Sequence, residues 1–234
     1  MRRLAALCHP ILFLAASPAV NAGRPLSTED ASHLADKACQ VEAWIDRSSE
    51  QAQGWFVPAC NFGLGIEWQL GFSRASSATE AGSRFPETYL QAKTAWTLPV
   101  KSWAVGTVIG VTRHRARDDE FGSNPYILIP LSHVVDAAGT TVHANLGWSR
   151  GGPADVNRTL WGLAVEHPLP SGLTLLAETF GDDRGNPFFR AGGRYAAIRN
   201  RLDLDLSYVL RSGGDRAERF ISIGFHWQAD PFLP

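Results

Sequence analysis

The chain has 234 residues, of which 44% are hydrophobic and 19% are charged. Its 22 Lys and Arg residues nearly balance its 23 Asp and Glu residues, so there is no long-range attraction for nucleic acid, and we expect no such partner. The hydrophobic content excludes disorder as the main state, while the length allows one large domain or two small ones.

The first residues have the pattern of a secretory signal peptide. Arg2 and Arg3 precede an apolar stretch over residues 4–16, and residues 20–22 supply small side chains at a cleavage site. The alternative is an N-terminal membrane helix, but prolines interrupt this span, which is also shorter than the ~20 residues that a bilayer requires. We therefore expect that residues 1–22 are a signal peptide, which implies export.

The next segment, residues 23–38, is polar and compatible with a short helix that Ser27 or Thr28 could cap. Three placements are open. The segment could rest at the periplasmic mouth of the β-structure that follows, fold into its interior as a plug, or remain a disordered leader.

Two cysteines remain after the predicted cleavage, Cys39 and Cys60. In an oxidising, exported compartment such a pair is more often bridged than free. In the predicted first hairpin, one cysteine begins a strand and the other lies near the end of the returning strand. Their Cβ atoms could then approach within the ~3.5–4.5 Å that a disulfide requires. We expect this disulfide, with two buried free thiols as the alternative.

Alternation with a period of two runs through the rest of the chain, with one parity uncharged and the other largely polar. Two segments are less regular, because one contains Pro58 and the other contains Pro130. The alternation predicts strands near 39–47, 54–62, 64–74, 87–97, 101–113, 124–134, 140–150, 158–168, 172–181, 187–198, 201–211 and 218–228.

Alternation alone is equally compatible with a soluble sandwich, so other features must decide between the two folds. Tight connections alternate with mostly longer polar loops, which is typical of an outer-membrane barrel. Five tryptophans are segregated as two aromatic girdles require. Those at the tight-turn ends are Trp96, Trp103 and Trp227, and those at the long-loop ends are Trp148 and Trp161.

The sequence therefore predicts an all-β fold: a single antiparallel, up-and-down transmembrane β-barrel of about 12 strands. The barrel would span residues 39–228, followed by a short tail, 229–234. The last strand is similar to the aromatic-terminated last strand that the outer-membrane insertion machinery recognises, and either Trp227 or Phe232 could be its terminal aromatic residue. We expect the protein in the cell outer membrane, with its lipid and the insertion machinery as partners.

Several short stretches carry a family resemblance, which covers nearly all of the mature chain. They are Arg24-Pro25-Leu26, Glu29-Asp30-Ala31, Cys39-Gln40-Val41-Glu42, Pro58-Ala59-Cys60, Ala177 to Asp182 and Ala191 to Leu210. These stretches resemble outer-membrane β-barrels of the transporter-like group that is related to the phenol-degradation MetA-pathway proteins. The resemblance implies an outer-membrane barrel of a Gram-negative bacterium and leaves its cargo open.

Enzyme chemistry has little support in the sequence. The sharpest candidate is a phospholipase-like set of His143, Asn145 and Ser149. These residues share the lumen-facing parity of one strand, whereas a lipase of this kind needs its catalytic residues to reach lipid. We therefore expect no enzyme, and we expect neither a catalytic residue nor a metal site or cofactor.

The charged residues of the lumen-facing parity are six acids and three bases. They are Glu42, Glu67, Glu166, Glu178, Asp203 and Asp205, with Lys93, Arg190 and Arg194. One interpretation is a structural network of interior salt bridges, which Arg194 could join between its neighbouring strands. The other is a narrow aqueous path that favours cations. Two functions follow: a passive or substrate-selective channel for small solutes, or a non-transporting barrel that is a structural or interaction scaffold.

Overall fold

The computed structural model describes residues 24–77, 87–100, 102–115, 121–151, 156–216, 218–229, 231 and 233. The predicted signal peptide and Phe232 lie outside these residues. Within the described part of the chain, no helix is long and apolar enough to cross a membrane.

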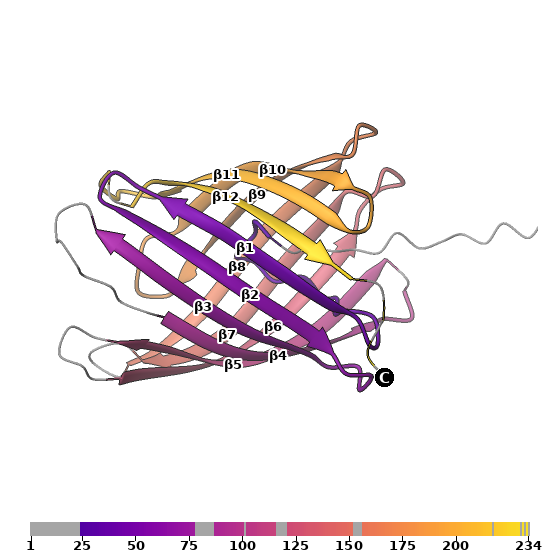
Figure 1. The fold of residues 1–234 in the computed structure, drawn as a ribbon, viewed down its shortest axis with the longest axis horizontal. Helices are drawn as coiled ribbons and strands as arrows, with labels where there is room; N and C mark the ends of the chain where they lie inside the picture. Colours follow the sequence, from indigo (N-terminus) through magenta and orange to yellow (C-terminus); the bar gives the residue numbers. More distant parts are fainter. Residues whose placement is uncertain are drawn as a thin grey trace, which may run out of the picture.

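Antiparallel strands that follow one another in sequence pair side by side and close into a barrel (Figure 1). The strands are β1 (Cys39–Arg47), β2 (Gln51–Asn61), β3 (Glu67–Ser77), β4 (Glu87–Thr97), β5 (Trp103–Arg115), β6 (Phe121–Val134), β7 (Thr141–Gly151), β8 (Val156–Pro168), β9 (Leu173–Asp182), β10 (Phe188–Ile198), β11 (Leu202–Arg211) and β12 (Phe220–Gln228). The predicted single up-and-down barrel of about 12 strands is confirmed.

The barrel closes where β1 pairs with β12, and Val41 lies opposite Trp227 in this seam. Among the described strands, closure leaves no unpaired edge, which is the condition for placing a sheet in lipid. The alternation of β11 shows the two faces clearly. Leu204 and Leu206 are exposed on the outside, whereas Asp205 is buried on the inside.

The two ends of the barrel differ in their connections. At the short-turn end, where β1 begins and β12 ends, neighbouring strands are joined by turns such as 62–66 and 169–172 (Figure 1). We call the opposite end the long-loop end. Strand β3 begins later than predicted because Gly63 and Gly65 adopt positive φ angles of 85° and 66°, which keeps residues 62–66 in the turn.

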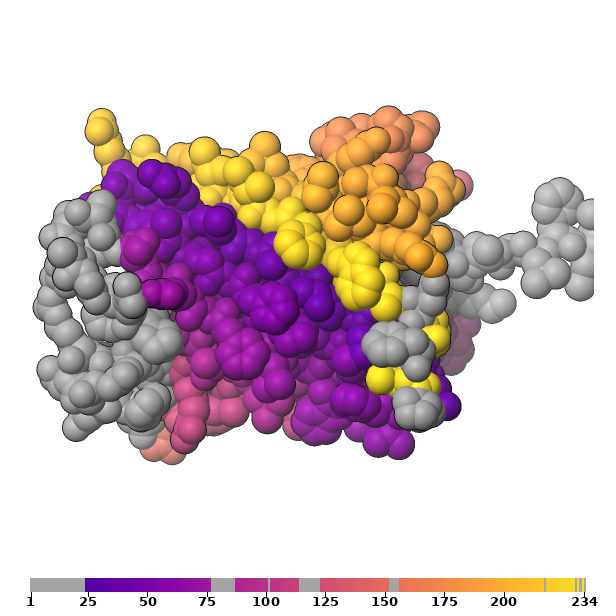
Figure 2. Space-filling model, viewed as in Figure 1, coloured from indigo at the N-terminus to yellow at the C-terminus, as the bar shows by residue number. Residues whose placement is uncertain are grey.

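Strands β1, β2, β3 and β12 lie side by side on one face of the outer wall (Figure 2). Large exposed hydrophobic side chains on these strands include Ile45, Phe56, Phe72, Ile223 and Phe225. Such a surface would be a liability in water, but it matches the apolar band that surrounds a membrane barrel.

The interior contains residues 24–38, which we call the luminal segment. Its Leu34 and Ala38 pack against Ala59 of β2, and all three side chains are buried. Ala31 is also buried. The packed core of this protein therefore lies between the luminal segment and the inner wall of the barrel.

Candidate functional site

The structure places all nine predicted lumen residues on inward-facing strand positions. Seven are buried: Glu42, Glu67, Lys93, Glu166, Glu178, Arg190 and Asp205. The other two, Arg194 and Asp203, are partly buried and line the same interior hollow. Two pairs connect wall strands directly, because Arg194 lies 3.0 Å from Glu166 and Arg190 lies 3.4 Å from Glu178.

Carboxylates of the barrel wall also bind the luminal segment. Glu178 accepts hydrogen bonds from the backbone N–H of Ser27, at 2.8 and 3.0 Å, and from that of Thr28, at 2.8 Å. Glu67 accepts a third backbone N–H, from Leu34, at 2.8 Å. The wall carries more acids than bases. Backbone N–H groups of the segment therefore satisfy wall carboxylates that have too few basic partners on the wall itself.

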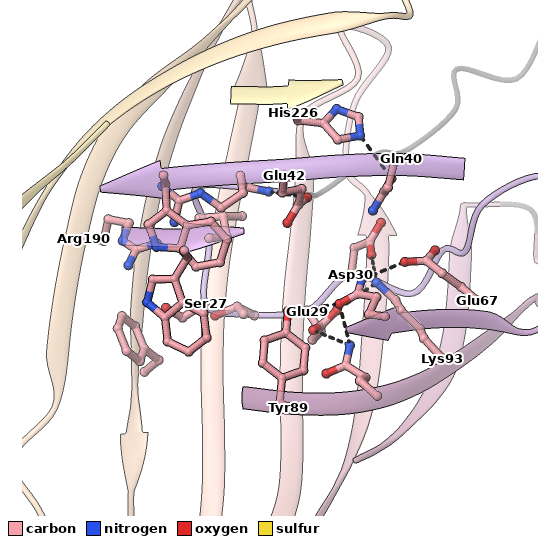
Figure 3. Close-up of a pocket in the computed structure, with 18 of the residues that line it drawn as sticks. Ser27, Glu29, Asp30, Gln40, Glu42, Glu67, Tyr89, Lys93, Arg190 and His226 are labelled. Atoms are coloured by element: carbon pink, nitrogen blue, oxygen red, sulfur yellow. Dashed lines mark hydrogen bonds and ion pairs between the residues drawn. The ribbon is translucent and has the colours of Figure 1, made fainter. Parts of the chain in front are cut away.

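Charged side chains of the segment add two further anchors, of which Figure 3 shows the one formed by Glu29 and Asp30 with Lys93. Arg24 donates through Nη2 to Asp205, at 3.1 Å, and to the hydroxyl of Ser222, at 2.6 Å. Lys93 of β4 donates to Glu29, at 2.9 Å, and to Asp30 of the segment. Lys93 and Asp30 are nearly fully buried, which weakens the screening of their attraction, whereas Glu29 is partly exposed.

The contacts of the luminal segment extend around the whole barrel. Its partners lie on β1, β3, β4, β6, β9 and β11, and they include Glu42, which accepts the Arg24 N–H at 3.3 Å. Figure 3 shows Ser27, Glu29 and Asp30 between the strands that carry Arg190 and Lys93. The segment thus crosses the lumen rather than following one wall.

The phospholipase-like set is not assembled. His143 is fully buried, and its Nδ1 lies 2.8 Å from the hydroxyl of Ser132 rather than meeting Ser149. That hydroxyl accepts the Ala31 N–H at 2.8 Å, and Asn145 donates to the Glu29 carbonyl at 3.0 Å. These β6 and β7 side chains hold the luminal segment. Among the described residues, no group of three or more His, Cys, Asp or Glu side chains could hold a metal ion.

An aromatic vestibule lies between the luminal segment and the long-loop end. We define it by its inward aromatic side chains, which are Trp44, Trp55, Tyr89, Tyr126, Phe180, Phe188 and Phe220. They line part of a cavity of about 660 Å³. The rings of Trp44 and Trp55 stack with centroids 5.5 Å apart, and those of Phe180 and Phe188 stack at 5.4 Å.

This vestibule is not among the features predicted from the sequence. Aromatic residues in a membrane barrel are expected in girdles on the lipid-facing surface, so aromatic residues of the lumen are easily missed. A signal was nevertheless present, because Trp44 lies between Glu42 and Asp46 on the polar parity of its strand. The same parity that places those acids inside also places the indole inside.

The disulfide between Cys39 and Cys60 is present. The two residues are direct partners in the β1–β2 register, and their Cα atoms lie 4.1 Å apart. Because residue 38 ends the luminal segment, the disulfide fixes the point where that segment joins the wall.

The five predicted girdle tryptophans have these positions. Trp96, Trp103 and Trp227 lie near the short-turn end, Trp148 lies near the long-loop end, and Trp161 lies opposite Gly181, next to the last residue of β9. Trp96, Trp148 and Trp227 are exposed on the outer surface, with 40% or more of each side chain accessible.

A closed barrel with this strand number, an apolar outer wall and a polar interior has the fold of outer-membrane β-barrel channels. The chain belongs to the family described as Uncharacterised conserved protein UCP029691, whose model matches residues 11–227. No curated protein matches the sequence.

Solved structures share the fold at low sequence identity. The KdgM porin has a TM-score of 0.62, with 6% identity over 80% of this chain and 98% of that one. The same porin has also been solved in complex with disordered oligogalacturonate. The COG4313 outer membrane channel from Pseudomonas putida F1 has a TM-score of 0.57, with 10% identity over 87% of this chain and 99% of its own. Outer membrane phospholipase A from Escherichia coli has a TM-score of 0.50, with 12% identity over 83% and 93% of the two chains.

Proposed function

We propose that the protein is an outer-membrane channel for small solutes and that the luminal segment is its plug. The observation that carries this proposal is the position of residues 24–38, which cross the lumen and bind strands on opposite sides of it. The fold shared with the KdgM porin and the Pseudomonas putida channel supports a transport role. In this proposal, solutes pass only when the plug is displaced from its wall contacts.

The proposal includes the route by which the protein reaches its membrane. Residues 1–22 direct export, and the last strand, β12, engages the insertion machinery of a Gram-negative outer membrane. The resemblance of the mature chain to the transporter-like group related to the MetA-pathway proteins supports the same placement. In this orientation the short-turn end faces the periplasm and the long-loop end faces the outside.

A non-transporting barrel is the second candidate function. It is favoured by the density of contacts between segment and wall, in which Asp30 and Lys93 are nearly fully buried. Breaking such buried pairs is costly, and a segment held this firmly could serve only to complete the core.

Planar-bilayer conductance distinguishes the two functions. Glu178→Ala removes the carboxylate that binds two backbone N–H groups of the plug, so we expect more frequent or larger openings than in the native protein. Asp182→Asn is the matched control, because Asp182 lies on the same strand but pairs with Arg158, away from the plug. It should leave the current unchanged.

A tether provides the converse test. A Cβ atom added at Gly162 would lie 3.4 Å from Cβ of Thr28, close to the separation found in disulfides. We expect the double variant Thr28→Cys with Gly162→Cys to stay closed when oxidised and to conduct again after mild reduction. If neither the native protein nor Glu178→Ala passes current, the barrel is non-transporting and the channel proposal is wrong.

A further inference from the structure

Arg190 of β10 is a buried cation with unused hydrogen-bonding capacity. Its side chain is only 5% exposed, and it lines the interior cavity (Figure 3). Its contact with a carboxylate is the 3.4 Å ion pair from Nε to Glu178, and neither Nε nor Nη1 forms a hydrogen bond with any residue in the described part of the chain. Buried guanidinium groups are normally satisfied by acceptors, so these donors point to an acceptor that the described residues do not supply.

The nearby acid does not meet this need. Glu178 uses both carboxylate oxygens to accept the backbone N–H groups of Ser27 and Thr28. The other Lys and Arg side chains that line the cavity pair with separate acids: Arg24 with Asp205, Lys93 with Glu29 and Arg194 with Glu166. Arg190 is therefore the cation best able to take an added anion.

Flat aromatic surfaces stand beside this cation. The Arg190 guanidinium lies over the ring of Phe180, 5.7 Å from its centroid, and Phe180 stacks on Phe188. A second pair, Trp44 and Trp55, lines the same cavity from β1 and β2. The ring centroids of Tyr89 and Trp55 lie 6.0 Å apart. Aromatic faces of this kind hold planar rings and the apolar faces of sugars through stacking.

We infer that the aromatic vestibule is a binding site for a small ring compound that bears a carboxylate. Arg190 binds the carboxylate, and the aromatic side chains hold the ring. The cavity of about 660 Å³, which the vestibule lines in part, is within the range of small-molecule sites and gives room for one such solute beside the plug. This inference rests on the proposed channel function for its meaning in transport, but the binding itself does not require conduction.

The acids of the cavity argue less strongly for a cationic ligand. Asp46 has one oxygen without a partner, but its other oxygen accepts the indole N–H of Trp44 at 3.1 Å. Glu42 accepts the backbone N–H of Arg24. A cation would also meet the charges of Arg24 and Arg190 in the same cavity. The carboxylate therefore has the better-defined partner.

The test is calorimetric titration of the full mature protein in detergent, with tryptophan fluorescence as a second readout. Benzoate and galacturonate are the probes, and they distinguish an aromatic acid from a sugar acid as the preferred ring. Benzyl alcohol and benzylamine have the benzoate ring without its carboxylate. We expect one of the two acids to bind at least about tenfold more tightly than both controls, because a hydrogen-bonded ion pair is lost without the carboxylate.

Variants locate the site. Arg190→Gln should weaken binding of the acid by about 10- to 100-fold. Arg190→Lys retains the charge beside Glu178 but lacks the planar fork, so it should fold and still bind more weakly than the native protein. Arg211→Gln is the matched control: Arg211 lies over the ring of Phe188 but is outside the cavity lining, and its loss should leave affinity unchanged.

Equal affinity for benzoate, benzyl alcohol and benzylamine would overturn the inference, as would native-like binding of the acid by both Arg190 variants. Failure of both acids to bind would overturn it as well. A barrel that binds an acid through Arg190 but passes no current would refute the channel and leave this site standing. A conducting barrel that binds neither acid would refute this site alone.

Discussion

An arginine placed on the outer wall tests which face of β11 meets lipid. Leu206 is the fifth of ten residues in this strand, so it lies close to the middle of the apolar band. It faces outward, because 56% of it is exposed. Arginine facing lipid at the midplane of such a barrel costs ~2–4 kcal/mol. We expect Leu206→Arg to lower the free energy of unfolding from the membrane by this amount.

The depth of the site sets a second expectation. Leu204 also faces outward but lies two residues nearer the short-turn end, which is about 5 Å along the membrane normal for a strand tilted by roughly 40°. Leu204→Arg should therefore cost less than Leu206→Arg. Leu206→Ala is the control for lost leucine contacts, and it should have a small effect because lipid replaces them.

The assay is equilibrium unfolding by urea or guanidinium from phospholipid vesicles, followed by tryptophan fluorescence. The free energies of the three variants are compared with that of the native protein at one lipid composition. If Leu206→Arg costs under 1 kcal/mol, or no more than Leu206→Ala, the outward assignment of β11 is wrong. An equal cost for both arginine variants would instead refute the depth assignment.

Two further predictions concern the short-turn end. Removing the disulfide with Cys39→Ser and Cys60→Ser should lower the free energy of unfolding by ~3 kcal/mol, since the bond closes a loop with a sequence separation of 21. The same denaturant unfolding from vesicles measures this change, and an unchanged unfolding midpoint would contradict the prediction. Hydrogen bonds from the Thr140 hydroxyl and backbone N–H hold the pKa of Asp136 below its ordinary value. Their stabilising effect is thus present above the unfolded-state pKa and is lost as the pH falls through the folded-state pKa. An NMR titration should show this lowered pKa rising in Thr140→Val, and an unchanged pKa would contradict the assignment.

The sequence was sufficient to predict the barrel because a single property, the parity of each strand, repeats along the chain. Leu204, Asp205 and Leu206 illustrate this, since lipid on one side and the lumen on the other impose opposite polarity on neighbours. Strand ends were predicted less well where turn geometry decided them, as at Gly63 and Gly65.

The contents of the lumen could not be predicted in the same way. Glu178 binds Ser27 across 151 residues of sequence, and the donors are backbone N–H groups that every residue except proline possesses. Such contacts leave no pattern in the sequence. The acid excess of the wall is visible in the sequence, but its backbone partners are not, so the sequence left both an interior salt-bridge network and a cation path open. Trp44 was different, because its inward parity could have been read from the sequence.

The seam between β1 and β12 constrains the order in which this protein can assemble. Its strands lie at opposite ends of the barrel sequence, so their pairing closes the longest loop in the wall and should form late. The luminal segment leads directly into β1, and the Ala229 N–H donates to the Cys39 carbonyl at 2.9 Å, beside the point where the segment enters. Residues 24–38 must therefore be in place as the seam closes, or must later thread through the short-turn mouth. The timing of closure during insertion, as well as the final contacts, thus decides whether the lumen is filled.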